Sequence, residues 1–206
     1  LCQHPRLLHR RGPPQSYYSY CRALGLCAEG EKKQFVLQGN AKLCSAVHNG
    51  RKVFCTVLAT DCADLIDIEF FTAGADLPGL IEDAHTAGVK VVCSSHDFHK
   101  TPPCAELVSR MTAMQEAGAD LPKLAVMPTC RADVIALLAA TAEMADHHPE
   151  TPVITMSMGT LGAVSRLCGE AFGSAMTFAN PGAASAPGQV PLDVVNEVLE
   201  SLHAER

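Results

Sequence analysis

The stretch ADLIDIEFFTAGADLPGLIEDAHTAG, residues 63–88, is the part of the sequence that decides the fold. Its opening, ADLIDIEFF, is rich in isoleucine and phenylalanine and predicts a β-strand. The apolar positions Leu80, Ile81 and Ala84 then fall on one face of a helix that a glycine ends. The stretch therefore predicts a βα unit.

The same alternation recurs through the rest of the chain. Strand patterns at VKVVCSS, PKLAVMP, PVITMSM and SAMTFA are followed by helix patterns at AELVSRMTAMQEAG, ADVIALLAATAEMADHH, GAVSRLCGEAFG and PLDVVNEVLESLH. Apolar strands separated by helices are typical of a covered parallel sheet. Neither G-x-G-x-x-G nor G-x-x-x-x-G-K-[ST] follows a strand, so the usual signs of a doubly wound nucleotide-binding fold are missing. We therefore predict an α/β fold, a TIM (β/α)8-type barrel.

Composition limits the class of protein. With 48% hydrophobic residues in 206, the chain can bury a core. Its apolar runs are far shorter than the roughly 18–20 residues that cross a bilayer, and no secretory signal pattern is found, so we expect no membrane partner. The ten cysteines include no C-x-x-C pair, which favours a reducing compartment and a cytoplasmic protein.

Charge divides the chain near residue 62. Residues 1–62 contain nine Lys and Arg against three Asp and Glu, whereas residues 63–206 contain seven against nineteen. In the first part the candidate strands QFVLQG and KVFCTVLA are isolated, and six of the ten cysteines lie there. A basic arm for nucleic acid is one interpretation, but the basic residues are scattered and the net charge is −6. We expect no nucleic-acid partner.

Lys123 stands at the start of the predicted strand PKLAVMP. Alternation puts Lys123, Ala125 and Met127 on one face of this strand, and Leu124 and Val126 on the other, which suits contact with helices. Lys123 would then point into the barrel. An ammonium in a poorly solvated interior has its pKa lowered, and the neutral amine is a nucleophile toward carbonyls. The pattern fits a Schiff-base lysine, or a lysine whose stem is buried while its ammonium reaches water.

His96, Asp97 and His99 follow the strand VKVVCSS, at the end where barrels hold their catalytic groups. Histidine is suited to proton transfer near neutral pH. The H-x-x-H pair could bind a metal, but no third ligand follows at a convincing spacing, so we expect none. A histidine held by hydrogen bonds in the core is the other interpretation, for His99 in particular. Asp97 could orient either imidazole.

Several motifs together resemble one enzyme family. SSHDFHKTP, LPKLAVMP, ITMSMGTLGAVSRLCGEAFGSAMTFA and ASAPGQ, in this order, are similar to motifs of the type I 3-dehydroquinate dehydratases of the shikimate pathway, which leads to the aromatic amino acids. The resemblance runs from about Ala63 to Arg206. It implies a (β/α)8 barrel, often a homodimer, that needs no metal or organic cofactor. It also implies a carbon–oxygen lyase that dehydrates 3-dehydroquinate to 3-dehydroshikimate through an imine on a lysine.

The resemblance also implies roles for individual residues. Lys123 would form the imine with the C3 ketone of the substrate. His96 would abstract the C2 proton and then act as an acid when the C1 hydroxyl leaves as water. Arg166 would hold the substrate carboxylate, a task that suits a planar fork of donors.

Four further residues match the family pattern. Ser185 and Gln189, in the loop NPGAASAPGQVP, correspond to residues that close over the substrate and hydrogen-bond it. Asp67 and Glu69 correspond to strand-end carboxylates, which we expect to support the polar network of the barrel in a structural rather than a catalytic role.

The family's earlier motifs, E-W-R-x-D and F-R-x-x-x-E-G-G, are not found in residues 1–62. The nearest fragment, RALGLCAEGEKKQF, has Arg22, Glu29 and Gly30 at a different spacing. We therefore predict a divergent or non-homologous segment over residues 1–62, such as a joined fragment or one read in a shifted frame. Residues 63–206 would form five βα units of the barrel. The rival interpretation is a divergent segment that completes the barrel in its own way.

Two alternative functions stay open because part of the substrate-binding set is missing. One is an imine-forming lyase or aldolase that acts on another small keto acid. The other is an inactive truncated barrel.

Overall fold

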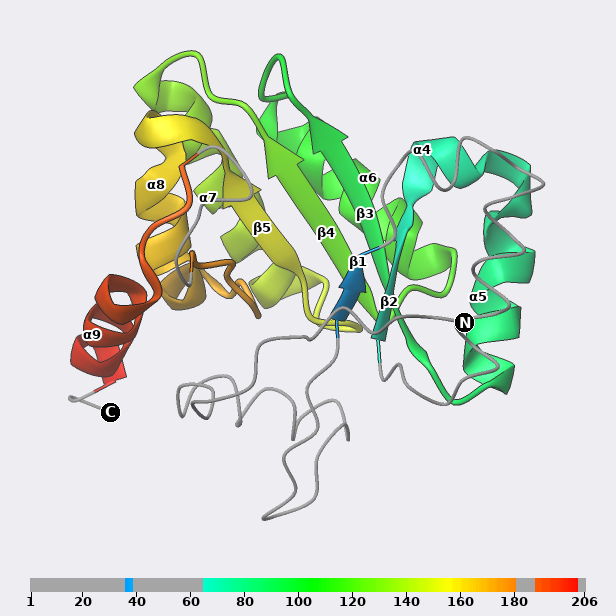
Figure 1. Ribbon diagram of the computed structural model, residues 1–206. Coiled ribbons are helices and arrows are strands. Elements are labelled where there is room, and N and C mark those ends of the chain that lie inside the picture. Colours follow the sequence, from blue (N-terminus) through cyan, green and yellow to red (C-terminus); the bar gives the residue numbers. More distant parts are fainter. Residues whose placement is uncertain (1–35, 39–64, 181–187, 204–206) are drawn as a thin grey trace. The chain divides into compact units, whose positions relative to one another are not determined.

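The computed structural model describes residues 36–38, 65–180 and 188–203. These residues form a five-stranded parallel sheet in the order β1-β2-β3-β4-β5 (Figure 1). The strands are β1 (Val36–Gln38), β2 (Leu65–Glu69), β3 (Lys90–Asp97), β4 (Leu121–Val126) and β5 (Ile154–Ser157). Each described strand lies beside the previous one, without the reversal of order that marks a doubly wound sheet. This arrangement confirms the predicted α/β class and agrees with a barrel.

Helices follow the strands as the alternation predicts. They are α4 (Phe70–Ala73), α5 (Leu77–Thr86), α6 (Cys104–Glu116), α7 (Arg131–His147), α8 (Gly159–Cys168) and α9 (Leu192–His203), with short 3-10 turns η1 (Gly74–Asp76) and η2 (Gly169–Phe172). On α5, Leu80, Ile81 and Ala84 are buried, as predicted. The predicted strand QFVLQG contains β1, whereas KVFCTVLA lies outside the described residues. No helix of the described ranges is long and apolar enough to cross a membrane.

Local sequence sets where these elements begin and end. The carboxylate of Asp133 accepts the backbone N–H groups of Thr129 and Cys130, and α7 starts at the following residue, Arg131. Gly118 follows α6 with a φ of 95°, a left-handed conformation that favours glycine. The chain then turns into β4.

The predicted strand SAMTFA, residues 174–179, is wrong. Its first residue, Ser174, makes a single parallel bridge with Val153, and the residues that follow lie in irregular backbone. The Ser174 side chain supplies the physical reason, because its Oγ accepts the backbone N–H of Thr155 at 3.1 Å. A regular strand would offer a backbone carbonyl to that donor. The segment leaves the sheet, and Phe178 reaches the site described below.

One face of the sheet packs on the helices. Figure 1 shows α6 and α7 behind β3, β4 and β5. One buried cluster joins residues of the sheet to residues of these helices: Ile66, Ile68, Val91, Leu124 and Val126 to Leu107, Met111 and Leu137. The prediction that Leu124 and Val126 face the helices is confirmed. Lys123 therefore points to the other side of the sheet.

Candidate active site

The face of the sheet opposite the helices carries a group of polar side chains. They are Asp67 and Glu69 on β2, Ser94 and His96 on β3, and Lys123 on β4. Alternate residues of a strand share a face, and the register sets Ser94 beside Glu69 in β2 and beside Lys123 in β4. Three adjacent strands therefore build one polar cluster.

Lys123 is buried in this cluster and paired with a carboxylate. Its side chain is 2% exposed, and its Nζ lies 2.7 Å from Oδ2 of Asp67, whose side chain is 3% exposed. A buried charge is tolerated where an opposite charge and hydrogen bonds compensate it. Asp67 compensates the ammonium of Lys123. The alternative prediction, an ammonium that reaches water, is wrong.

His96 is held by a second carboxylate. Its Nδ1 lies 2.8 Å from Oε2 of Glu69. An ionised carboxylate can only accept a hydrogen bond, so the Nδ1 atom carries the proton of the neutral ring. Nε2 is then the basic nitrogen. Because the His96 side chain is 22% exposed, the ring can meet a ligand while Glu69 fixes its orientation.

Ser94 stands between the two carboxylates. Its Oγ donates to Oδ1 of Asp67 at 2.5 Å and lies 3.2 Å from Oε2 of Glu69. The negative charges of Asp67 and Glu69 act on the neighbouring thiol of Cys93. Burial, together with the charges of Asp67 and Glu69, raises the pKa of Cys93 to about 12.

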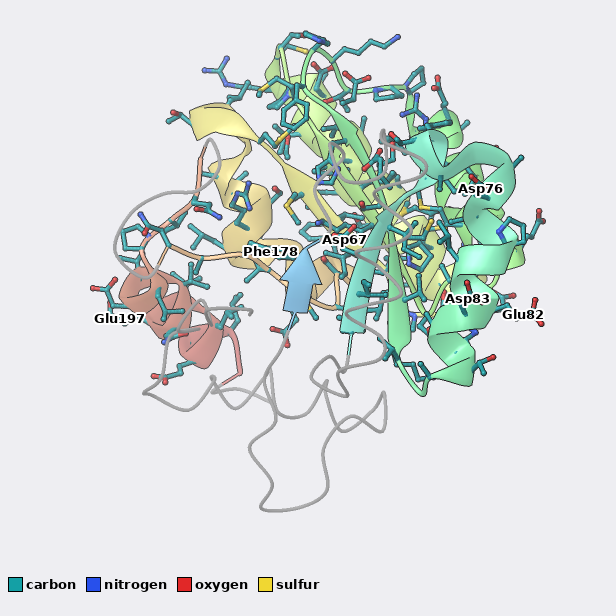
Figure 2. The ribbon with its side chains drawn as sticks, turned by 45° about the vertical axis from the view of Figure 1, so that its right-hand side comes forward. Asp67, Asp76, Glu82, Asp83, Phe178 and Glu197 are labelled. Atoms are coloured by element: carbon teal, nitrogen blue, oxygen red, sulfur yellow. The ribbon has the colours of Figure 1, made fainter. Side chains whose placement is uncertain are left out.

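Phe178 connects the lysine to Arg166. The Nζ of Lys123 lies 5.0 Å from the centroid of the Phe178 ring, within cation–π range, and Nη1 of Arg166 donates to the Phe178 backbone oxygen at 3.4 Å. Figure 2 labels Asp67 and Phe178, both of which lie next to the Lys123 amine. Arg166 is 2% exposed, and burial lowers the pKa of its guanidinium. The buried arginine thus lies beside the lysine site.

The loop that carries the predicted substrate contacts is described at its end. Ser185 lies outside the described residues, and Gln189 is half-buried. Gly188, before Gln189, has a φ of 75°, and a Cβ there would collide with the backbone of Gly159 at the start of α8. The end of the loop is therefore pressed against the N-terminus of the helix that carries Arg166.

Two interpretations of the HDFH motif need correction. The carboxylate of Asp97 accepts the backbone N–H groups of His99 and Lys100, each at 3.0 Å, and Glu69 is the residue that orients His96. Slight burial raises the pKa of Asp97, but these two donations, together with the positive charges of Lys100 and Arg110, hold the pKa below its usual value. His99 is exposed, so the suggestion of a core histidine is wrong.

The sequence patterns point to no role for Ser94 or Phe178, and they predict only a supporting network for Asp67 and Glu69. In the structure these carboxylates contact Lys123 and His96 directly. The signal for Ser94 was its alternation with His96 on one strand. Phe178 offered no such signal, because its position depends on the irregular segment after η2. Within the part of the chain that the structure describes, no group of three His, Cys, Asp or Glu residues could hold a metal ion.

The chain is similar to known proteins in sequence. The family model of the type I 3-dehydroquinases matches residues 38–206. The 3-dehydroquinate dehydratase of Clostridium kluyveri is 46% identical over 179 residues, which cover 86% of this chain and 66% of that protein. The enzyme of Klebsiella pneumoniae is 53% identical over 139 residues, covering 68% and 55%. This chain therefore spans less than two thirds of the length of these relatives.

Solved structures agree with the sequence matches. The type I 3-dehydroquinate dehydratase of Clostridium difficile, solved with covalently modified comenic acid, has a TM-score of 0.73 and 42% identity, covering 86% of this chain and 66% of that one. The enzyme of Geobacillus kaustophilus has a TM-score of 0.74 and 38% identity, covering 76% and 60%. These neighbours confirm the predicted (β/α)8 barrel type. Because the family match starts at residue 38, it includes part of residues 1–62, and the domain boundary at residue 62 stays a prediction.

Proposed function

Because the chain belongs to the type I 3-dehydroquinase family, we propose that it dehydrates 3-dehydroquinate to 3-dehydroshikimate as an enzyme of the shikimate pathway. One observation carries the proposal. Lys123 is a buried amine held at 2.7 Å by Asp67, on the same polar face as a histidine held at 2.8 Å by Glu69. A buried amine and an oriented imidazole are what imine chemistry with proton transfer requires.

Lys123 forms the covalent intermediate in this proposal. Once the ammonium of Lys123 has given a proton to solvent, the neutral amine attacks the C3 ketone, and loss of water gives an iminium ion. The iminium nitrogen withdraws electrons, so the C2 proton becomes acidic. Asp67 holds the lysine nitrogen in place and compensates its positive charge.

His96 then acts as base and as acid. The C2–H bond breaks and the proton moves to Nε2, while the bond electrons form C2=C3 and the C3=N pair moves to nitrogen. In the next step His96 returns its proton to the C1 hydroxyl, which leaves as water while C1=C2 and the iminium form. Hydrolysis of the iminium releases the product and restores the amine. Glu69 keeps Nε2 available throughout, because it binds Nδ1.

Arg166, Ser185 and Gln189 bind the substrate in this proposal. A guanidinium presents paired donors that match a carboxylate, and Arg166 lies next to Phe178 at the lysine site. Gln189 follows Gly188, which packs tightly against the start of α8, so the loop ends close to the helix that carries Arg166.

We also propose a homodimer in the cytoplasm. The described cysteines are all free, as in a reducing compartment, and light scattering tests the dimer.

Borohydride trapping tests the proposed function. The purified chain is mixed with 3-dehydroquinate, any imine is reduced, and the modified peptide is identified by mass spectrometry. We expect an adduct on Lys123 and none in Lys123→Ala. Lys100→Ala is the matched control, because Lys100 is exposed and lies at the end of the HDFHK sequence.

The other results of this experiment have distinct meanings. An adduct without dehydrated product would favour a lyase or aldolase that acts on another keto acid. A chain that melts cooperatively but gives no adduct would be an inactive barrel. An adduct that persists in Lys123→Ala would contradict the role of this lysine.

A further inference from the structure

Lys123 and His96 are joined by a continuous chain of polar contacts. Nζ of Lys123 lies 2.7 Å from Oδ2 of Asp67, and Oδ1 of Asp67 accepts the hydroxyl of Ser94. Oγ of Ser94 lies 3.2 Å from Oε2 of Glu69, and the same Oε2 lies 2.8 Å from Nδ1 of His96. Ser94 is the midpoint of this chain and is 1% exposed.

The reactions at Lys123 and His96, the two ends of this chain of contacts, indicate a function for Ser94 between them. When the C2 proton moves to His96, the iminium nitrogen on Lys123 becomes a neutral enamine and the imidazole becomes an imidazolium. A positive charge therefore leaves the nitrogen beside Asp67 and arises on the ring beside Glu69. One carboxylate loses its cation in the step in which the other gains one.

A hydroxyl group can compensate for this shift of positive charge from the lysine nitrogen to the imidazole. Ser94 has one O–H, which rotates about the Cβ–Oγ bond without movement of the backbone, and it can donate fully to one carboxylate at a time. Hydrogen bonds to charged groups are stronger than those between neutral groups. The charged and titratable groups around Ser94 are Asp67 and Glu69 on β2, His96 and the thiol of Cys93 on β3, and Lys123 on β4.

We propose that Ser94 is a positioning residue whose hydroxyl, which donates to Asp67 and lies within reach of Glu69, stabilises the Asp67 carboxylate when the lysine nitrogen loses its positive charge. It thereby lowers the barrier to the proton transfer between substrate and His96. The inference rests on the proposed function, since it requires an imine on Lys123. It assigns Ser94 to the proton-transfer step and not to formation of the imine.

The test compares two neighbouring serines in the full chain. Ser94→Ala removes the shared donor. Ser95→Ala is the matched control, because Ser95 is 3% exposed and its side chain lies on the opposite face of β3. Both variants are assayed for turnover of 3-dehydroquinate, for borohydride trapping on Lys123, and for cooperative thermal unfolding.

We expect Ser94→Ala to turn over about 10- to 100-fold more slowly while its trapped imine stays at the level of the parent chain. Ser95→Ala should keep both. Ser94→Thr keeps a hydroxyl and should recover most of the turnover.

Three results would overturn the inference. Ser94→Ala could turn over at the parent rate, or lose imine and turnover in parallel, as a purely structural residue would. Ser94→Thr could be as slow as Ser94→Ala, which would show that the hydroxyl is not the active feature. Failure of the parent chain to form any imine on Lys123 would instead refute the proposed function itself, and the inference with it.

Discussion

Leu124 and Lys123 are neighbours on β4 and are almost equally buried, at 0% and 2% exposure, yet they lie on opposite faces of the sheet. Leu124 belongs to an apolar cluster that any well-fitting hydrocarbon could fill. Lys123 lies in a cluster where each polar group depends on a specific partner. Burial alone therefore does not reveal what a residue does. The role of a buried residue depends on the face of the sheet that it occupies, and variants on the two faces can be compared by experiment.

Removal of the lysine charge should have the largest effect on the polar face. Lys123→Met leaves the carboxylate of Asp67 buried without its cation, and we expect a loss of about 3–5 kcal/mol in the free energy of unfolding. Turnover should also fall by at least about 10³-fold. Urea unfolding and product formation measure the two effects.

The double variant Lys123→Met/Asp67→Asn sharpens this result. It removes both charges, so we expect it to regain most of the lost stability and to stay inactive. A double variant as unstable as the single one would show that packing, and not the unpaired charge, causes the loss.

On the apolar face, Leu124→Ala should lower the free energy of unfolding by about 2–5 kcal/mol, because it opens a cavity in the core. Activity per folded molecule should change little. Leu124→Met, which nearly conserves volume, is the control and should cost less than about 1.5 kcal/mol. Equal losses of activity in Leu124→Ala and Lys123→Met would show that the two faces do not differ in their importance for catalysis.

Cys93 belongs to the apolar cluster but lies near the charges of the polar face, and the effect of its titration should be confined to alkaline pH. Its folded-state pKa of about 12 exceeds the ordinary value of 9.0, so the folded chain holds the thiol proton more tightly than the unfolded chain. This contribution is fully present below pH 9 and is lost as the pH rises toward 12. We expect a loss of at most about 1.4 kcal/mol per pH unit over that range.

Cys93→Ala isolates this contribution. Its free energy of unfolding should decline less steeply than that of the parent chain above pH 9, whatever its value at neutral pH. Identical slopes would mean that Cys93 is not held in its protonated form by the fold.

Sequence patterns were sufficient to predict much of the molecule. Regular alternation of strands and helices identified the parallel sheet, and the two-residue period of β4 put Lys123 on the face away from the helices. Motif resemblance brought Lys123, His96 and Arg166 forward as candidates. The pattern of SAMTFA predicted a strand incorrectly, because the hydroxyl of Ser174 takes the place of the backbone carbonyl that a strand would offer to Thr155.

Apart from SAMTFA, sequence patterns were enough to identify the strands β2 to β5 and the face that each of their side chains takes, because both depend on steric preferences of near neighbours. Tertiary structure alone decided the partners. Lys123 meets Asp67 across 56 residues and His96 meets Glu69 across 27, and neither distance follows from a local pattern. The register between strands sets these contacts, and the packing of the whole sheet on its helices fixes that register. The register between β2 and β3 likewise places Ser94 beside the carboxylates of Asp67 and Glu69.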